Sequence, residues 1–118
     1  INFGRQEDKA MMAEVLKTIP DVTITSSFDH NLEIGGRTTS KADAVLHLCE
    51  ILDIHRDHTM AIGDSPNDEA MLRAAGYPVA MANGKESVRA IARFITGSND
   101  EDGVASAIHR LILCCPSL

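Results

Sequence analysis

The sequence is poor in aromatic residues, since its 118 residues include no Trp, one Tyr and three Phe. Aromatic rings form the stacking platform of proteins that bind single-stranded nucleic acid, so this class is excluded. Basic residues are also in deficit: 11 Lys and Arg face 17 Asp and Glu, which leaves a net charge of −6. Such a chain lacks the basic face that a nucleic-acid backbone requires. We therefore predict no nucleic-acid partner, and we expect any phosphate to be bound locally.

Long apolar runs are absent too. No run approaches the roughly 18 residues needed to cross a bilayer, and the chain does not open with a signal-peptide pattern. The cysteines, Cys49, Cys114 and Cys115, show no metal-ligand spacing and predict small buried thiols in a reducing compartment. These absences predict a cytoplasmic protein without a membrane partner. The first residue is Ile1 rather than Met, so we expect a piece of a longer chain.

The first third of the sequence has the pattern of a helix followed by a hairpin. Apolar residues at helical spacing predict a helix over residues 6–18, and Pro20 lies just beyond it. The β-branched residues over 22–28 and the short run 31–34 predict two antiparallel strands around a turn at residues 29–31. Gly35 and Gly36 break this pattern, and we place a domain boundary there.

From residue 36 onward, predicted helices and strands alternate. This order predicts βαβ units and an α/β fold with a parallel, Rossmann-like sheet flanked by helices. In the first helix, an apolar stripe is expected to face the core, and Pro78 is expected at a sheet edge or outside the strand pairing. The stripe comprises Ala44 or Val45, Leu48, Cys49 and Leu52. The helices are expected at 40–53, 66–75, 85–93 and 104–113, and the strands at 59–62, 77–81 and 94–96.

An acidic turn follows the first of these strands, with the sequence Gly63-Asp64-Ser65-Pro66-Asn67-Asp68. Ser65 and Pro66 suit the N-cap and first position of the next helix, so the turn should lie at the carboxyl edge of the sheet, where such folds bind ligands. Asp64 and Asp68 could then share a Mg²⁺ ion with phosphate oxygens. The alternative is a capping box of Ser65 and Asp68, which explains Asp68 but not Asp64.

Lys41 occupies the first turn of its predicted helix. The helix macrodipole opposes a cation there by roughly 0.3 to 1 kcal/mol at an exposed site. We therefore expect an anion nearby, and a phosphate or carboxylate held at the Asp64 turn would serve if both lie at one edge of the sheet. The alternative is a solvated lysine beside Asp43.

Several separated motifs resemble one family in their order and spacing. They are Ser40-Lys41 at a helix start, the acidic turn, Val79-Ala80-Met81-Ala82-Asn83, and Ser98-Asn99-Asp100-Glu101-Asp102-Gly103-Val104. Residues 32–113 resemble the C-terminal part of haloacid dehalogenase (HAD) superfamily phosphatases of the Cof type. Residues 1–31 resemble, more weakly, the last helix and strands of that family's α/β cap. The resemblance implies that 1–35 is a remnant of the cap subdomain and 36–118 the C-terminal part of the HAD core domain.

The resemblance also implies a chemistry, the Mg²⁺-dependent hydrolysis of a phosphomonoester through an aspartyl-phosphate. Lys41 matches the catalytic lysine that neutralises nucleophile and phosphate, and Asp64 matches the catalytic acid that binds Mg²⁺. Asn67 matches a phosphate-binding amide, and Asp68 matches a second metal-site acid that more often acts indirectly. The substrate would be a small phosphorylated metabolite such as a sugar phosphate. Cofactor and nucleotide phosphates stay open, because the cap supplies specificity in that family.

The sequence departs from the family where the nucleophile should be. The family's Asp-x-Asp-Gly-Thr motif has no counterpart, and Asp100-Glu101-Asp102-Gly103 falls in a polar loop at the far end. We therefore expect a C-terminal fragment with negligible activity alone. Its sheet would have an open edge, suited to the missing N-terminal half or to self-association. The competing hypothesis is a non-catalytic metal-binding or receiver-like α/β module.

Overall fold

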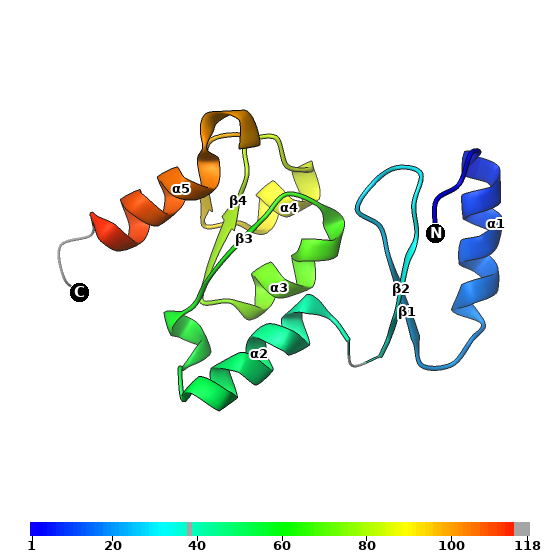
Figure 1. Ribbon diagram of the computed structural model, residues 1–118, viewed down its shortest axis with the longest axis horizontal. Helices are drawn as coiled ribbons and strands as arrows, with labels where there is room; N and C mark the ends of the chain where they lie inside the picture. The colour runs from blue at the N-terminus through cyan, green and yellow to red at the C-terminus, as the bar shows by residue number, and fades with distance from the viewer. Residues whose placement is uncertain (38, 115–118) are drawn as a thin grey trace.

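The computed structural model describes residues 1–37 and 39–114, and Figure 1 shows that they form two lobes side by side. The radius of gyration is 16.3 Å. A compact chain of this length would have a radius of about 13.5 Å. The molecule is elongated because the two lobes do not share one core. In the part of the chain that the structure describes, no helix is long and apolar enough to cross a membrane.

The N-terminal lobe, which we call the hairpin lobe, contains α1 (Gln6–Lys17), β1 (Val22–Thr25) and β2 (Glu33–Gly36). The strands are antiparallel, with Ile24 opposite Ile34, and α1 packs against β1. The predicted helix and hairpin are confirmed. The predicted end of the second strand at residue 34 is wrong, because Gly35 and Gly36 also pair with β1, while the domain boundary placed there stays a prediction. A Cβ atom at Gly35 would lie 3.0 Å from Thr39 Oγ1, so the Thr39 side chain would have to shift to accommodate it.

The second lobe, which we call the core lobe, is built on a parallel sheet in the order β3–β4–β5. Helices α3 and α4 pack against the sheet, and α2 packs against α3 (Figure 1). The predicted α/β fold and parallel pairing are therefore confirmed. The elements are α2 (Lys41–Leu52), η1 (Arg56–His58), β3 (Met60–Gly63), η2 (Pro66–Asp68), α3 (Glu69–Ala74), β4 (Tyr77–Ala80), α4 (Glu86–Ile91), β5 (Phe94–Ile95), η3 (Asn99–Glu101), α5 (Gly103–Ile108) and η4 (His109–Leu113, a π-helix).

The core between sheet and helices is small and aliphatic. Leu72 of α3, Val79 of β4 and Val88 of α4 are fully buried, and alanines fill the space around them. Alanine permits close approach of helix and sheet but contributes little apolar area. The stability of this lobe therefore depends on a few large side chains.

The position of Pro78 differs from the prediction. Pro78 is buried in β4, the central strand, and lies in register with Ala61 of β3. The N–H groups of Tyr77 and Met81 point to the β3 side, where they donate to Thr59 and Gly63. The missing N–H of Pro78 would point to the opposite side, at a level where β5 has not yet begun. Proline is tolerated here because no ladder hydrogen bond is lost.

The apolar stripe of α2 also differs from the prediction. No residue of α2 is buried, and the side chains of Leu48 and Leu52 are 54% and 55% exposed. The helix packs on α3 along one flank only, and among the described residues no element covers its other flank. The predicted burial of cysteines is wrong for Cys114, which is exposed beyond the last packed turn, while Cys49 is half-buried. Cys115 lies outside the described residues.

Candidate active site

The acidic turn leaves β3 at Gly63 and continues as a 3-10 turn, η2, before α3 begins. Gly63 is required because a Cβ atom at this position would lie 2.6 Å from the Cβ atom of Asp68. The predicted capping box is present: Ser65 and Asp68 exchange hydrogen bonds at the start of η2. The close approach of residues 63 and 68 folds the turn back on itself and directs its polar groups toward the carboxyl end of the sheet.

The carboxylate of Asp68 organises this turn. Oδ2 accepts from the backbone N–H groups of Asp64, at 3.1 Å, and Ser65, at 3.3 Å. Oδ1 accepts from Lys41 Nζ at 2.6 Å. Burial alone would raise the pKa of Asp68, but the Lys41 ammonium and the two N–H groups hold it below its usual value. Both carboxylate oxygens are thus engaged by the protein, which favours an indirect role at a metal over direct coordination.

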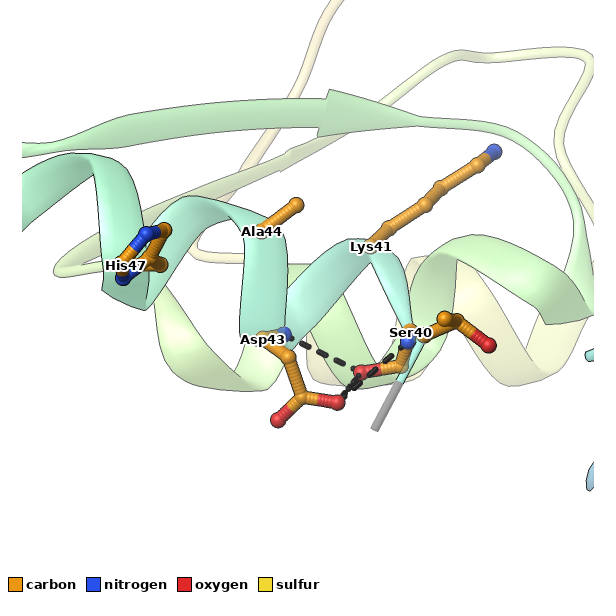
Figure 2. Close-up of a pocket in the computed structure, with 6 residues that line it drawn as sticks. Ser40, Lys41, Asp43, Ala44 and His47 are labelled. Atoms are coloured by element: carbon orange, nitrogen blue, oxygen red, sulfur yellow. Dashed lines mark hydrogen bonds between the residues drawn. The ribbon is translucent and has the colours of Figure 1, made fainter. Parts of the chain in front are cut away.

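Lys41 reaches this turn from the first turn of α2. Asp43 does not pair with it, because the carboxylate of Asp43 accepts from Ser40 in the N-terminal capping box of α2. Figure 2 shows the Lys41 side chain extending away from that capping box. The ammonium is instead bound to Asp68, 27 residues further along the chain. The alternative of a solvated lysine beside Asp43 is therefore wrong, and the expected anion in contact with Lys41 is a carboxylate of the acidic turn.

The predicted site residues line one cleft of about 380 Å³. The turn after β4 closes one side of it, because Lys85 N donates to the carbonyl oxygen of Asp64 at 2.8 Å. The hairpin lobe closes another side with Ser27 and Phe28. The lining residues are Ser27, Phe28, Lys41, Asp64, Ser65, Asn67, Asp68, Asn83 and Lys85. The structure thus brings together all four residues singled out from the sequence, which come from the start of α2 and from the acidic turn.

The carboxylate of Asp64 has no hydrogen-bond or ion-pair partner among the described residues, and the residue is exposed in the cleft. Residues 1–37 and 39–114 contain no cluster of three or more His, Cys, Asp or Glu side chains able to hold a metal ion by themselves. Mg²⁺ needs fewer protein ligands, since it is usually bound by one or two carboxylates, water and substrate phosphate. The free carboxylate of Asp64 fits this requirement, whereas Asp68 is already occupied.

Asn67 lies in the same cleft but faces the hairpin lobe. Its Nδ2 donates to Ser27 Oγ at 3.0 Å and to Glu33 Oε2 at 3.3 Å, and its Oδ1 accepts from Ser65 Oγ. The predicted contact of this amide with phosphate stays a prediction. In the observed arrangement the amide joins the two lobes.

Sequence reasoning missed Lys85 and the two hairpin residues of the cleft. Lys85 had a usable signal: it follows β4, and the carboxyl ends of parallel strands meet at one edge of the sheet. Its ammonium lies 3.7 Å from the carboxylate of Asp29 in the hairpin turn. Ser27 and Phe28 had no such signal, because the docking of one lobe on the other does not follow from local pattern.

The lowered pKa of Asp68 predicts a pH-dependent stability. A carboxylate whose pKa is depressed on folding stabilises the protein above its ordinary value, 3.8 here, and loses this contribution as the pH falls through the lowered pKa. We expect the free energy of unfolding, from urea denaturation, to fall below pH 4, and Asp68→Asn to flatten this slope. Asp100→Asn, at an exposed position, is the control. Parallel pH profiles of the wild type and Asp68→Asn would contradict the prediction.

Comparison of the chain with known proteins shows the family to which it belongs. The family of haloacid dehalogenase-like hydrolases matches residues 2–108. The phosphatase YwpJ of Bacillus subtilis is 45% identical over 92 residues, which cover 78% of this chain and 32% of YwpJ. The chain thus spans about a third of the length of this relative.

Solved structures agree in fold. A haloacid dehalogenase-like hydrolase from B. subtilis superposes with a TM-score of 0.89 at 38% identity, covering 94% of this chain and 39% of that one. A sugar phosphatase of HAD subclass IIB superposes with a TM-score of 0.79 at 31% identity, covering 86% of this chain and 39% of that one. On the family match, the sequence identity and the shared fold, the chain belongs to the haloacid dehalogenase-like hydrolases.

Proposed function

We propose that these residues provide the C-terminal part of the active site of a Mg²⁺-dependent phosphomonoester hydrolase. The observation that carries the proposal is that Lys41 and Asp64 line one cleft, although 23 positions separate the two residues in the sequence. An ammonium and a carboxylate at the carboxyl end of a parallel sheet suit a phosphate and its metal ion.

Each residue has a distinct role in this proposal. Asp64 would hold Mg²⁺, which when bound supplies positive charge to the phosphoryl oxygens. Lys41 would neutralise negative charge at the transferring group, and Asp68 would position the Lys41 ammonium through the 2.6 Å contact. Phosphoryl transfer needs mainly positioning and charge stabilisation, so these groups account for a large part of the chemistry.

The active site would still lack its nucleophile, an aspartate, which has to come from a segment outside the 118 residues. The sequence contains no Asp-x-Asp-Gly-Thr motif, and a carboxylate nucleophile is what divides the hydrolysis into two easier steps. Within the described residues β3 pairs only with β4, so its other edge is open. We propose that the N-terminal half of the enzyme packs along this edge, and that the 118 residues alone have negligible activity. Self-association along the same edge is the alternative occupant.

For the substrate we propose a small phosphorylated metabolite, with sugar phosphates as the first class to test. The cleft of about 380 Å³ is small, and a matched relative is a sugar phosphatase. The competing non-catalytic metal-binding or receiver-like module would need its own phosphate-accepting aspartate with acidic partners from another strand. The acidic residues that line the cleft, Asp64 and Asp68, both belong to the one turn after β3, which favours the hydrolase.

A chimera tests the proposal. The 92 residues of this chain that align with YwpJ would replace their counterparts in that protein, and hydrolysis of p-nitrophenyl phosphate would be followed with Mg²⁺ and with EDTA. We expect Mg²⁺-dependent turnover by the chimera and none by the 118-residue chain. Turnover of the isolated chain at ordinary phosphatase rates would contradict the proposed need for an external nucleophile. A folded chimera, judged by circular dichroism, that hydrolyses nothing would contradict the proposed activity.

A further inference from the structure

The two lobes are joined by a hydrogen-bonded contact that includes a residue of the proposed site. We call it the Asn67 bridge and define it by Asn67, Ser27 and Glu33. Asn67 Nδ2 donates to Ser27 Oγ at 3.0 Å and to Glu33 Oε2 at 3.3 Å, and Ser27 Oγ also contacts Glu33 Oε1. Asn67 is 40 positions from Ser27 and 34 positions from Glu33 in the sequence, so the bridge is a tertiary contact and not part of a local turn.

The bridge uses the full donor capacity of the Asn67 side chain. A carboxamide nitrogen carries two hydrogens, and here one is directed to Ser27 and one to Glu33. The carboxamide oxygen accepts from Ser65 Oγ. While the bridge is formed, the side-chain amide of Asn67 therefore has no N–H left to donate to a phosphate in the cleft.

The bridge stands between two clefts. One is the candidate active site, of about 380 Å³, and the other is a cleft of about 620 Å³ between β1, β2 and the start of α2. Lys41 and Asn67 line both clefts, and Glu33 lines the larger one. Asn67 therefore takes part both in the contact between the lobes, together with the Lys85–Asp29 ion pair, and in the lining of the active-site cleft.

We propose that docking of the hairpin lobe and binding of phosphate compete for the amide of Asn67. Glu33 and Ser27 are positioning residues that hold this amide in the docked state. A phosphate entering the cleft takes the amide from them, which frees the hairpin lobe from this contact. This inference rests on the proposed function, because it assumes that phosphate binds beside Lys41 and Asp64.

Charge adds to the competition. The carboxylate of Glu33 adjoins Asn67, and like charges a few ångströms apart repel even when water screens them. Removal of Glu33 should therefore tighten phosphate binding by both routes, since it releases the amide and removes a negative charge. We expect a gain of about three- to tenfold in affinity for Glu33→Ala, the range for one exposed charge and one hydrogen bond. Glu33→Gln, which keeps an acceptor but loses the charge, should give a smaller gain.

The experiment is a titration of the 118-residue chain with inorganic phosphate in the presence of Mg²⁺, followed by NMR. The side-chain amide of Asn67 reports the bridge through nuclear Overhauser contacts to the Ser27 side chain. The backbone amide of Ser65 reports phosphate in the cleft independently. Glu50→Ala is the matched control, because Glu50 is an exposed glutamate of α2 that lines neither cleft.

We expect the Asn67 to Ser27 contact without phosphate and its loss at saturation, with tighter binding by Glu33→Ala and wild-type binding by Glu50→Ala. If the contact persists when the Ser65 amide shows saturation, the inference fails while the proposed function stands. Equal affinities of Glu33→Ala and Glu50→Ala would overturn it in the same way. Phosphate that shifts neither amide in any variant would overturn the inference, while the proposed function is tested separately by the turnover of the chimera.

Discussion

Asp64→Asn is expected to remove most of the Mg²⁺-dependent turnover of the active chimera, with a loss of roughly a hundred- to a thousandfold in rate. The Asp64 carboxylate is the one in the acidic turn without a protein partner among the described residues, so it is available to a cation. An asparagine has the same shape but no charge, and loss of a group that stabilises transition-state charge typically costs roughly a hundred- to a thousandfold in rate. Initial rates across a Mg²⁺ titration measure the effect.

Asp68→Asn serves as the comparison. Both oxygens of Asp68 are bound by Lys41 and by backbone N–H groups, so its loss acts through the position of Lys41 and the shape of the turn. We expect a smaller loss of turnover, together with reduced stability, and Mg²⁺ dependence close to that of the wild type. Asp57→Asn is the control for the loss of one negative charge outside the cleft, because Asp57 lies on the exposed turn η1. Equal and small effects at positions 64 and 68 would exclude the metal role assigned to Asp64.

Leu72→Ala is expected to lower the free energy of unfolding of the chain by about 2 to 5 kcal/mol. Leu72 is fully buried between α3 and the sheet, and its neighbours Ala61, Ala75 and Ala80 are too small to fill the cavity. Small domains have only about 5 to 15 kcal/mol of stability, so this loss is a large fraction of the total. Urea denaturation followed by circular dichroism gives the value.

Leu48→Ala provides the matched control, because it removes the same atoms from a side chain that is 54% exposed on α2. We expect a loss of about 1 kcal/mol or less, since half the side chain is already in contact with water. A loss as large as that of Leu72→Ala would show that the exposed flank of α2 is covered in solution. Sedimentation velocity would then reveal whether a second copy of the chain covers it.

Much of the core lobe could be predicted from local pattern. The helix over residues 41–52, the strands around 60–63 and 77–80 and the turn between them follow from apolar periodicity, the capping residues Ser40 and Ser65 and the position of Pro66. Parallel pairing followed from the alternation of strands and helices. These features are local, so the residues that determine them are close in sequence.

The errors occurred where distant segments decide the outcome. Pro78 is tolerated in the central strand because β5 is short, and Leu48 is exposed because nothing in the described chain covers that flank of α2. The capping-box alternative for Asp68 is confirmed, while the role of Asp68 at a metal site stays a prediction. The same carboxylate caps η2 and binds Lys41, and no local pattern distinguishes one role from two.

The sequence by itself determined the order of helices and strands, the acidic turn and the identity of the charged residues, because these depend on neighbours within a few positions. The tertiary structure alone decided that Lys41 pairs with Asp68, that the Asp64 carboxylate has no partner within residues 1–37 and 39–114, and that the side-chain amide of Asn67 donates to the hairpin lobe. Such contacts depend on how β3, α2 and the hairpin turn meet in space. A difference of a few ångströms in that packing determines whether a charged group is bound by the protein or left for a ligand.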